Sequence, residues 1–358
     1  MTATISEPRV DPAKLEAFLG RVIGDIGAAM SCGLARIGDR LGLYRAMAGA
    51  GPITAGQLAE RTGTAERYVR EWLINQAAGG YVEYDAGTER YTLPAEHAIA
   101  LADESAPFFV GGGFQVALAM LKAEPRIADA FRTGEGMLWG EHDSELFPGT
   151  ARFFRPGYAA HLVSEWIPAL DGVEERLRAG GKVADIGCGF GASTILMASA
   201  YPRSRFLGFD THAPSIERAR MAAGEAGVAD RVTFEVASAA EFPGSGYDLV
   251  TFFDCFHDMG DPVAAARRAR ESLAPGGAAM IVEPMAGERV EENLNPIGRA
   301  YSGASTLCCT PNAVACGGAG LGAVASDTAL RAAAEAGGFR RFRRAAETPF
   351  NRVFDARP

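Results

Sequence analysis

A turn of alternating glycines after an acidic residue carries the clearest chemical information in this chain. Asp185 precedes Gly187, Gly189 and Gly191 at the junction between a short apolar strand and a helical stretch. Residues without a Cβ let such a turn adopt positive φ and let a ligand approach the backbone. With Ala192 the turn also fits the dinucleotide pattern G-x-G-x-x-G/A. Asp185, however, would face a pyrophosphate with like charge, and it suits a ligand that has a cationic amino group and a nearby sulfonium.

S-adenosylmethionine (SAM) has both of these groups, so the turn indicates SAM binding, with S-adenosylhomocysteine as the product, rather than NAD binding. Asp210 ends the apolar run Arg205–Phe209, 25 residues after Asp185. An acidic residue at the end of a second strand accepts hydrogen bonds from ribose hydroxyls in nucleotide-binding folds. The alternative is that Asp210 only caps the helix that starts near Pro214.

The segment Asp-Ile-Gly-Cys-Gly-Phe-Gly at 185–191 resembles the first motif of class I SAM-dependent methyltransferases. The resemblance assigns Asp210 to the ribose and the stretch around Ser238 to the adenine, although an acidic residue is common where Ser238 stands. Asp254 is assigned to the cofactor as well. Tyr158 is expected either to reach the SAM carboxylate or simply to pack.

The segment Phe252–Asp261 resembles the His-Asp-Trp-x-Asp segment of winged-helix O-methyltransferases, with Met259 in place of Trp. The resemblance makes His257 the general base, a role that suits an imidazole with a pKa of about 6.5. It makes Glu283 the carboxylate that orients His257. The second carboxylate of those enzymes falls in 315–326, which holds no Asp or Glu. O-methylation is therefore favoured, with S-, N- or C-methylation as the alternative.

A metal is the other chemistry that His257 and Asp258 suggest. Some related C-methyltransferases that act on keto acids bind iron through a His-Asp pair and a later histidine. No histidine follows His257, since the chain has histidines at 97, 142, 161, 212 and 257 only. The cysteines form no C-x-x-C pair either. The sequence therefore predicts no metal.

Strands and helices alternate from residue 180 onward, which predicts an α/β, doubly wound parallel sheet. The last two strands are too close for a crossover helix and are expected to pair antiparallel. A seven-stranded sheet that ends in such a pair matches the Rossmann-like class I methyltransferase domain. The expected strands are 182–185, 205–210, 232–236, 247–253, 278–282, 339–344 and 351–355.

The first 108 residues predict an α-rich winged helix. A long amphipathic stretch over 12–50 precedes two short helices and two alternating strands around Asp85-Ala86-Gly87. The second helix carries Arg67 and Arg70 beside Glu66 and Glu71, so it is not a basic recognition face. In small-molecule methyltransferases this module dimerises and covers the substrate pocket, and the resemblance implies both roles here.

Residues 109–175 predict a helical connector rich in aromatics between the winged helix (1–108) and the SAM-binding domain (176–358). Side chains on loops between domains are candidates for substrate contact. We expect the acceptor to contact Trp139, His142 and Phe154, and a pocket wall to include Cys308 and Cys309.

Composition limits the partners. A formal charge of −9 opposes general binding to nucleic acid or to anionic membranes. We read no membrane-spanning run and no signal peptide, which predicts a cytoplasmic protein. The expected partners are a small, partly apolar acceptor and a second copy in a homodimer. The competing classes are a ligand-sensing winged-helix transcription regulator and an NAD-dependent oxidoreductase.

Overall fold

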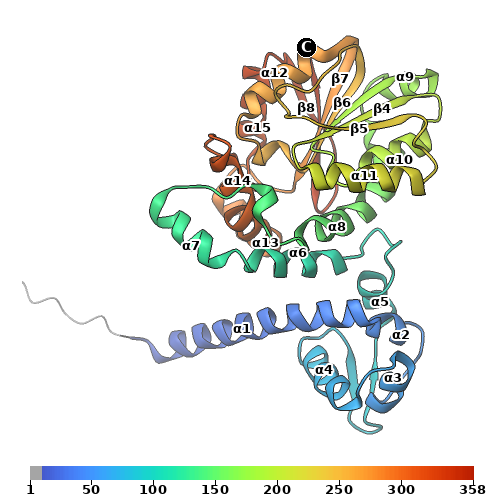
Figure 1. The fold of residues 1–358 in the computed structure, drawn as a ribbon. Coiled ribbons are helices and arrows are strands. Elements are labelled where there is room, and N and C mark those ends of the chain that lie inside the picture. The colour runs from blue at the N-terminus through green and yellow to red at the C-terminus, as the bar shows by residue number, and fades with distance from the viewer. Residues whose placement is uncertain (1–9) are drawn as a thin grey trace, which may run out of the picture. The chain divides into compact units, whose positions relative to one another are not determined.

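The computed structural model describes residues 10–358 (Figure 1). This described chain divides into two compact units, of which one ends at Phe114 and the other spans Gln115–Pro358. The unit boundary divides the connector that the sequence suggested over 109–175: residues 109–114 belong with the smaller unit and residues 115–175 with the larger.

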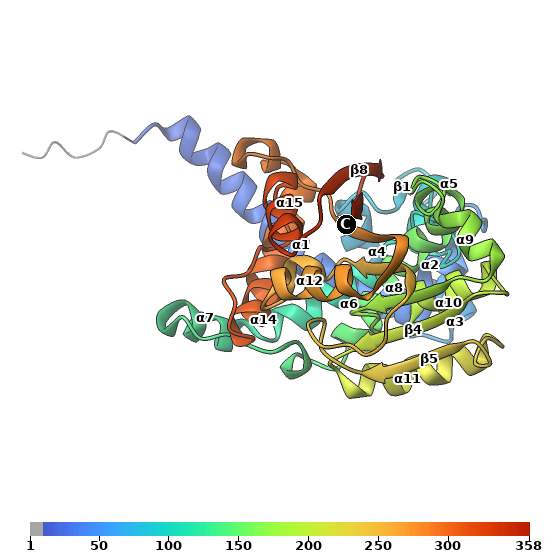
Figure 2. The same cartoon turned by 90° about the horizontal axis from the view of Figure 1, so that it is seen from above.

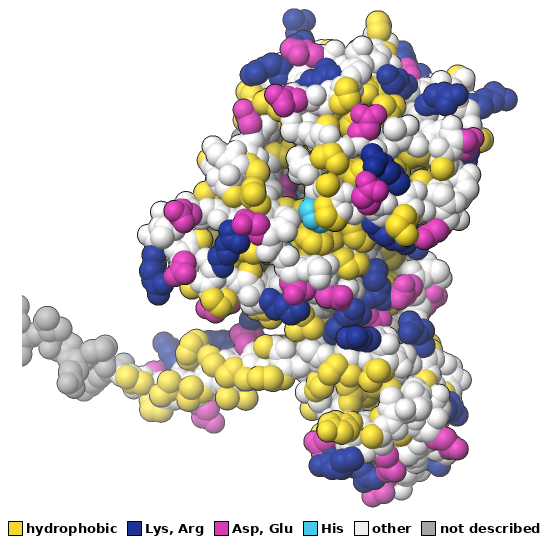
Figure 3. All heavy atoms as spheres, viewed as in Figure 1, with side chains coloured by type: hydrophobic (Ala, Val, Ile, Leu, Met, Phe, Trp, Pro, Cys, Tyr) yellow, Lys and Arg dark blue, Asp and Glu magenta, His cyan; other side chains and the backbone are white. Residues whose placement is uncertain are grey.

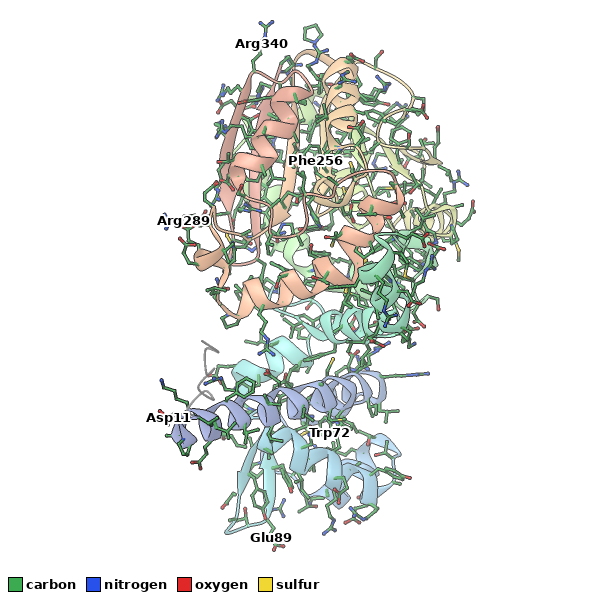
Figure 4. All side chains as sticks on the ribbon, turned by 90° about the vertical axis from the view of Figure 1, so that its left-hand side faces the viewer. Asp11, Trp72, Glu89, Phe256, Arg289 and Arg340 are labelled. Atoms are coloured by element: carbon green, nitrogen blue, oxygen red, sulfur yellow. The ribbon has the colours of Figure 1, made fainter. Side chains whose placement is uncertain are left out.

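The N-terminal unit contains the expected helices and wing. Thr54 begins α3 with a capping box, because its hydroxyl accepts from the Gln57 backbone N–H while the Gln57 side chain accepts from the Thr54 N–H. Trp72 on α4 donates its indole N–H to Leu34 O on α1 at 2.8 Å, and Figure 4 labels it beside that helix. The elements are α1 (Pro12–Leu41), α2 (Leu43–Met47), α3 (Ala55–Thr62), α4 (Glu66–Ala78), β1 (Glu83–Asp85), β2 (Arg90–Thr92) and α5 (Ala95–Leu101).

Only the C-terminal end of α1 is buried in its own unit, at Ala35, Gly38 and Asp39. The rest presents an exposed apolar stripe, which Figure 3 shows as a nearly continuous hydrophobic surface. By length and composition α1 could cross a membrane, which differs from the sequence interpretation given above. Between residues 10 and 30, the exposed large apolar side chains are Val10, Leu15, Phe18, Leu19, Ile23, Ile26 and Met30.

The larger unit is built on one sheet. Within residues 115–358, seven strands form it in the order β5-β4-β3-β6-β7-β9-β8. All neighbours are parallel except β7–β9 and β8–β9, which are antiparallel. This confirms the predicted Rossmann-like fold. The strands are β3 (Lys182–Ile186), β4 (Arg205–Asp210), β5 (Val232–Val236), β6 (Tyr247–Phe253), β7 (Leu273–Pro284), β8 (Arg341–Glu347) and β9 (Asn351–Arg357).

Helices cover both faces of the sheet, as Figures 1 and 2 show. One face buries an apolar layer from α9 (Val173–Ala179), α10 (Ala192–Ala200) and α11 (Ala213–Glu225), together with the π-helical turn η2 (Leu162–Trp166). The other buries α12 (Pro262–Ser272) and α15 (Asp327–Ala336). A sheet covered on both faces explains the almost continuous apolar runs that made its strands visible in the sequence.

Arg352 on β9 is fully buried, which is unusual for an arginine. Its guanidinium donates to Pro284 O, to Asp327 Oδ1 and to Ala325 O, at 2.7–2.9 Å. The group is therefore paired with one carboxylate and two backbone carbonyls. It fastens the end of β7 to the segment that begins α15.

Two helical regions flank the carboxyl edge of the sheet. One contains α6 (Gly111–Leu121), α7 (Glu124–Thr133), the short turn η1 (Trp139–Glu141) and α8 (Leu146–His161). The other is a helix in three parts: α13 (Pro296–Ala304), the π-helical turn η5 (Ser305–Cys309) and α14 (Thr310–Ala315). Pro311 has no N–H to continue the α-helical hydrogen bonding, which accounts for the irregular turn before it. Such π-helical turns are frequent at functional sites.

Candidate functional site

The glycine turn joins β3 to α10 with all of its glycines at positive φ. Gly187, Gly189 and Gly191 have φ of 70°, 51° and 76°. A Cβ on Gly187 would lie 2.7 Å from Cys255 Sγ, and one on Gly191 would lie 2.5 Å from the Phe234 ring. At Gly189, by contrast, no atom lies within 4 Å of the Cβ position. The first and last glycines are therefore required by packing, and the middle one faces open space.

Asp185 lies under this turn, 1% exposed. Its carboxylate accepts from the hydroxyls of Ser193, Thr194 and Thr251 at 2.5–2.9 Å. Burial raises its pKa, and the hydroxyl groups oppose that rise. The carboxylate therefore ties β3 to the first turn of α10 and to β6. The contact with a ligand's amino group expected from the sequence stays a prediction.

Asp210 ends β4 beside the open glycine. Its carboxylate accepts from Gly189 N at 2.9 Å and from His212 N at 2.8 Å. Burial raises its pKa, while these backbone N–H groups lower it. The helix after it, α11, has His212 at the N-cap position and no side-chain cap. The carboxylate therefore holds the glycine turn and does not cap α11.

His257 and Glu283 form a buried pair at the ends of β6 and β7. His257 Nδ1 lies 2.7 Å from Glu283 Oε2, and Glu283 Oε1 accepts from Phe256 N at 3.1 Å. Burial alone would lower the pKa of His257, but Glu283 and the nearby Cys309 raise it well above 6.5. Figure 4 labels the adjacent Phe256 in the interior of the domain. Because the Nδ1–H group donates a hydrogen bond to Glu283, Nε2 is left to accept a proton.

Asp258 and Cys309 lie close to His257. One donor atom from each of these residues and from His257 lies within 4.8 Å of the others. Burial raises the pKa of Asp258 to about 7, although His257 lowers it. Residues 315–326 offer no second carboxylate. The structure instead places the carboxylate of Asp258 and the thiol of Cys309 beside His257.

Backbone contacts hold the segments around His257 together. His257 O accepts from Leu321 N and Gly322 N at 3.2 and 3.1 Å. A Cβ on Gly318 would lie 1.9 Å from Gly260 O. The glycine-rich loop after α14 therefore packs directly on the segment that follows β6.

The start of α14 is fixed in the same way. Asn312 donates to Asp258 O at 3.1 Å and accepts from Trp139 N at 2.9 Å. A Cβ on Gly136 would meet Pro311 O and the Ala315 backbone at 2.2–2.7 Å. Asn312 thus links the loop that carries Trp139 to the segment that carries the buried histidine.

Asp254 occupies the first position after β6 with φ of 51°, which is uncommon outside glycine. Its carboxylate accepts from Tyr158 Oη at 2.6 Å and from Asn351 Nδ2 at 2.8 Å. Burial raises its pKa to about 7, and both hydrogen bonds lower it. Tyr158, predicted to contact the cofactor, is thereby linked from α8 to the sheet edge.

The residues expected to contact an acceptor lie in several places. Trp139 packs edge-on against Phe147, which contacts the His212 ring. Phe154 stacks on Tyr158. His142 is 6% exposed and neither ring nitrogen has a hydrogen-bond partner. Cys308 is buried in an apolar cluster with Trp139 and Leu307, whereas Ser238 follows β5 and is half-buried.

Comparison with known families agrees with this geometry. Residues 28–103 match the Rv2258c-like winged HTH domain, and residues 177–328 match a family described as methyltransferase domain. The chain joins a winged-helix domain to a methyltransferase domain. The second match contains the glycine turn, Asp210, His257, Glu283 and Cys309.

Individual relatives match over shorter stretches. The 27-O-demethylrifamycin SV methyltransferase of Amycolatopsis mediterranei (strain S699) is 40% identical over 103 residues, which is 28% of this chain and 38% of that protein. The probable chloroplastic tocopherol O-methyltransferase of Oryza sativa subsp. japonica is 29% identical over 157 residues, 40% of this chain and 41% of that protein. The matched part thus spans about two fifths of these relatives.

Solved structures share the fold along the whole chain. The mitomycin 7-O-methyltransferase MmcR has a TM-score of 0.70 and 20% identity, covering 97% of this chain and 100% of that one. Human N-acetylserotonin methyltransferase in complex with SAM has a TM-score of 0.65 and 18% identity, covering 99% of each chain. At such identities the likeness concerns the fold.

Sequence reasoning missed one residue of the methyltransferase domain's candidate site, Asn351. It comes from β9, far along the chain from β6, and lies in no recognisable motif. Cys309 was expected, with Cys308, to line a pocket, but its place beside His257 was not predicted.

Proposed function

We propose that this protein is a SAM-dependent methyltransferase that methylates an oxygen of a small, partly apolar molecule, with His257 as general base. The carrying observation is the buried His257–Glu283 pair at the carboxyl edge of the sheet, where ligands bind in such folds. SAM, when bound, supplies an electrophilic methyl group on a sulfonium. His257 would take the acceptor hydroxyl proton at Nε2 as the oxygen accepts the methyl group. Glu283 stabilises the resulting imidazolium.

The glycine turn suits a cofactor of this kind. Gly189 has no Cβ, and no atom lies within 4 Å of the position that a Cβ would take. The backbone there is therefore open to a ligand. Asp210 stands next to it and keeps acceptor capacity for ribose hydroxyls, since a carboxylate has about four lone-pair sites. Trp139 and Phe147 lie close to His212, two residues after Asp210, and supply aromatic surface for an acceptor or an adenine.

The names of the relatives support oxygen as the acceptor atom. The tocopherol and mitomycin enzymes are described as O-methyltransferases, and the rifamycin enzyme acts on a demethylated oxygen by its name. Apolar groups that would suit a partly apolar acceptor are the stacked rings of Phe154 and Tyr158 and the indole of Trp139. S-, N- or C-methylation is the alternative, and the His257 variant discussed below separates a thiol acceptor from a hydroxyl.

Asp210→Ala is expected to weaken SAM binding by about 1–3 kcal/mol, because ribose hydroxyls would lose a buried acceptor. Isothermal titration calorimetry with SAM and S-adenosylhomocysteine measures this. Asp230→Ala is the matched control, since its side chain is 74% exposed on another loop, and it should leave the affinity unchanged. Unchanged affinity in Asp210→Ala would reject Asp210 as the ribose ligand. Preference of the wild type for NAD over SAM would reject the cofactor itself.

We propose in addition that a second copy of the chain covers the apolar stripe of α1. The buried end of this helix belongs to the winged-helix core, and Arg21 and Asp25 interrupt its exposed part, so a membrane is a poor environment for it. A large exposed apolar surface is typical of an interface.

The double variant Phe18→Glu/Ile23→Glu is expected to sediment as a monomer, because it puts two charges into the stripe. Sedimentation velocity of the full chain measures this at several concentrations. Tyr68→Glu is the control, since Tyr68 is 81% exposed on α4, away from the stripe, and this variant should remain dimeric. A monomeric wild type, or a dimeric double variant, would contradict the proposal.

A role as a DNA-binding regulator has less support. Arg67 pairs with Glu71, and Arg70 with Glu66, along the exposed face of α4. These pairs neutralise the helix that would enter a DNA groove. We therefore assign the winged helix to dimerisation.

A further inference from the structure

Three side chains of different types, one of them the proposed base His257, lie close together. A ring nitrogen of His257, a carboxylate oxygen of Asp258 and Cys309 Sγ all lie within 4.8 Å of one another. His257 is 3% exposed, and the other two side chains are half-buried. The carboxylate and the sulfur thus come from two segments that lie far apart in the chain and meet beside His257.

We propose that His257, Asp258 and Cys309 form a binding site for a borderline-soft divalent cation such as Zn²⁺, and that a cation held there blocks the base. Imidazole, carboxylate and thiolate are the ligand types that Zn²⁺ takes in proteins, and the thiolate disfavours Mg²⁺ and Ca²⁺. Three protein ligands leave a fourth tetrahedral position for water. The sequence predicted no metal because no histidine follows His257, whereas in the structure Cys309 supplies a third donor atom.

The surrounding contacts prepare the site. Glu283 accepts a hydrogen bond from His257 Nδ1–H, which leaves the lone pair on Nε2, and a carboxylate in this position is typical of histidines that ligate metals. Asn312, three residues after Cys309, donates to Asp258 O, so the segments that carry the sulfur and the carboxylate are joined. Leu321 and Gly322 fix the backbone of His257.

The distances are compatible with a metal. Tetrahedral zinc with bonds of about 2.0–2.3 Å needs donor atoms roughly 3.3–3.7 Å apart. The separations in the structure reach at most 4.8 Å, so rotations that move the donor atoms by about 1 Å would close the site. On binding, Cys309 releases its thiol proton to solvent and binds as the thiolate.

The consequence for catalysis rests on the proposed function. A cation on Nε2 occupies the lone pair with which His257 would accept the acceptor's proton. Metal binding and base catalysis therefore exclude each other, and Zn²⁺ acts as an inhibitor whose removal restores the base.

Cobalt titration of the full-length protein, cleared of metal with EDTA, tests the site without any need for activity. The expected result is one equivalent of Co²⁺ bound with a thiolate-to-cobalt charge-transfer band and with the visible bands of tetrahedral cobalt. Cys309→Ser should abolish the charge-transfer band and lower the affinity at least about tenfold. Asp258→Asn should lower the affinity but keep the band. Cys32→Ser, which alters a half-buried thiol in the winged helix, is the control and should behave as the wild type.

The outcomes separate the two proposals. Absence of the band, or a band that survives in Cys309→Ser, overturns the metal site whatever the enzyme does. Comparison of the melting temperatures of the metal-free variants identifies any loss caused by misfolding, and Asp258→Asn then serves as the second variant. Once an acceptor is known, Zn²⁺ should inhibit the wild type, EDTA should restore it, and Cys309→Ser should resist. Activation by Zn²⁺ would overturn the blocking role. If the wild type binds the metal and the His257→Ala variant remains active, His257 is not the base, but the metal site stands.

Discussion

His257→Ala is expected to lower turnover by about 10²–10⁴-fold and to leave SAM affinity nearly unchanged, because base catalysis acts in the transition state. The imidazole is buried, and its Nδ1 is held by Glu283 at 2.7 Å, so no solvent group replaces it readily. The measurements are kcat with the identified acceptor and calorimetry with SAM. A nearly silent substitution would discard the base and favour a thiol acceptor, which ionises without help when its pKa is depressed.

The pH profile gives the same test in another form. The base must be neutral to accept a proton, and the pKa of His257 lies well above 6.5, so the rate should rise with pH and reach half its maximum above that value. Glu283→Gln removes the charge that raises this pKa. Its loss of turnover should therefore be smaller than that of His257→Ala, and its pH limb should move toward lower pH. A limb that stays in place would separate Glu283 from the base.

Arg352→Met is expected to lower the free energy of unfolding by about 2–4 kcal/mol. Methionine keeps much of the aliphatic stem but leaves Pro284 O and Ala325 O, both in buried surroundings, without their donor. Asp327 keeps Arg344 as a partner, so the estimate stays below the cost of an isolated buried charge. Urea unfolding followed by circular dichroism measures the change.

Arg341→Met is the matched control for this variant. Arg341 lies on the neighbouring strand β8 and pairs with Asp171 at the surface, where both side chains are more than half exposed. Such pairs contribute about 0–1 kcal/mol. A loss in Arg352→Met no greater than in Arg341→Met would show that the buried guanidinium has no special role in stability.

The sheet could be predicted closely because its strands are buried on both faces and read as apolar runs. β4, β5 and β6 begin and end at the predicted residues, and β3 differs by one residue. β7 begins at Leu273 and not at the predicted residue 278. Its first residues were not predicted as strand because they include Pro275 and Gly276 and lack the apolar pattern of a strand. The antiparallel pairing at the end of the sheet was predicted only from the short connection between the last two strands.

The candidate site could be predicted only where a motif marks the end of a strand. His257 lies just after β6, and Glu283 lies near the end of β7. A parallel sheet brings such residues to one edge. The environment of each group was not predictable. Asp185, expected to face a ligand, is enclosed by hydroxyls from α10 and β6, and Cys309 arrives through an irregular helical turn. Both depend on contacts between segments far apart in the chain.

The close backbone contacts of Gly318 with Gly260, and of Gly136 with Pro311, bear on how this site can acquire new substrates. No side chain fits at either glycine, so the wall that includes α14 and the loop after it tolerates little variation. The aromatic side chains of Trp139 and Phe154 meet other side chains and can change size without moving backbone. Substitutions that adapt the protein to a different acceptor would therefore occur at these aromatic side chains, while the close glycine contacts keep His257 in position.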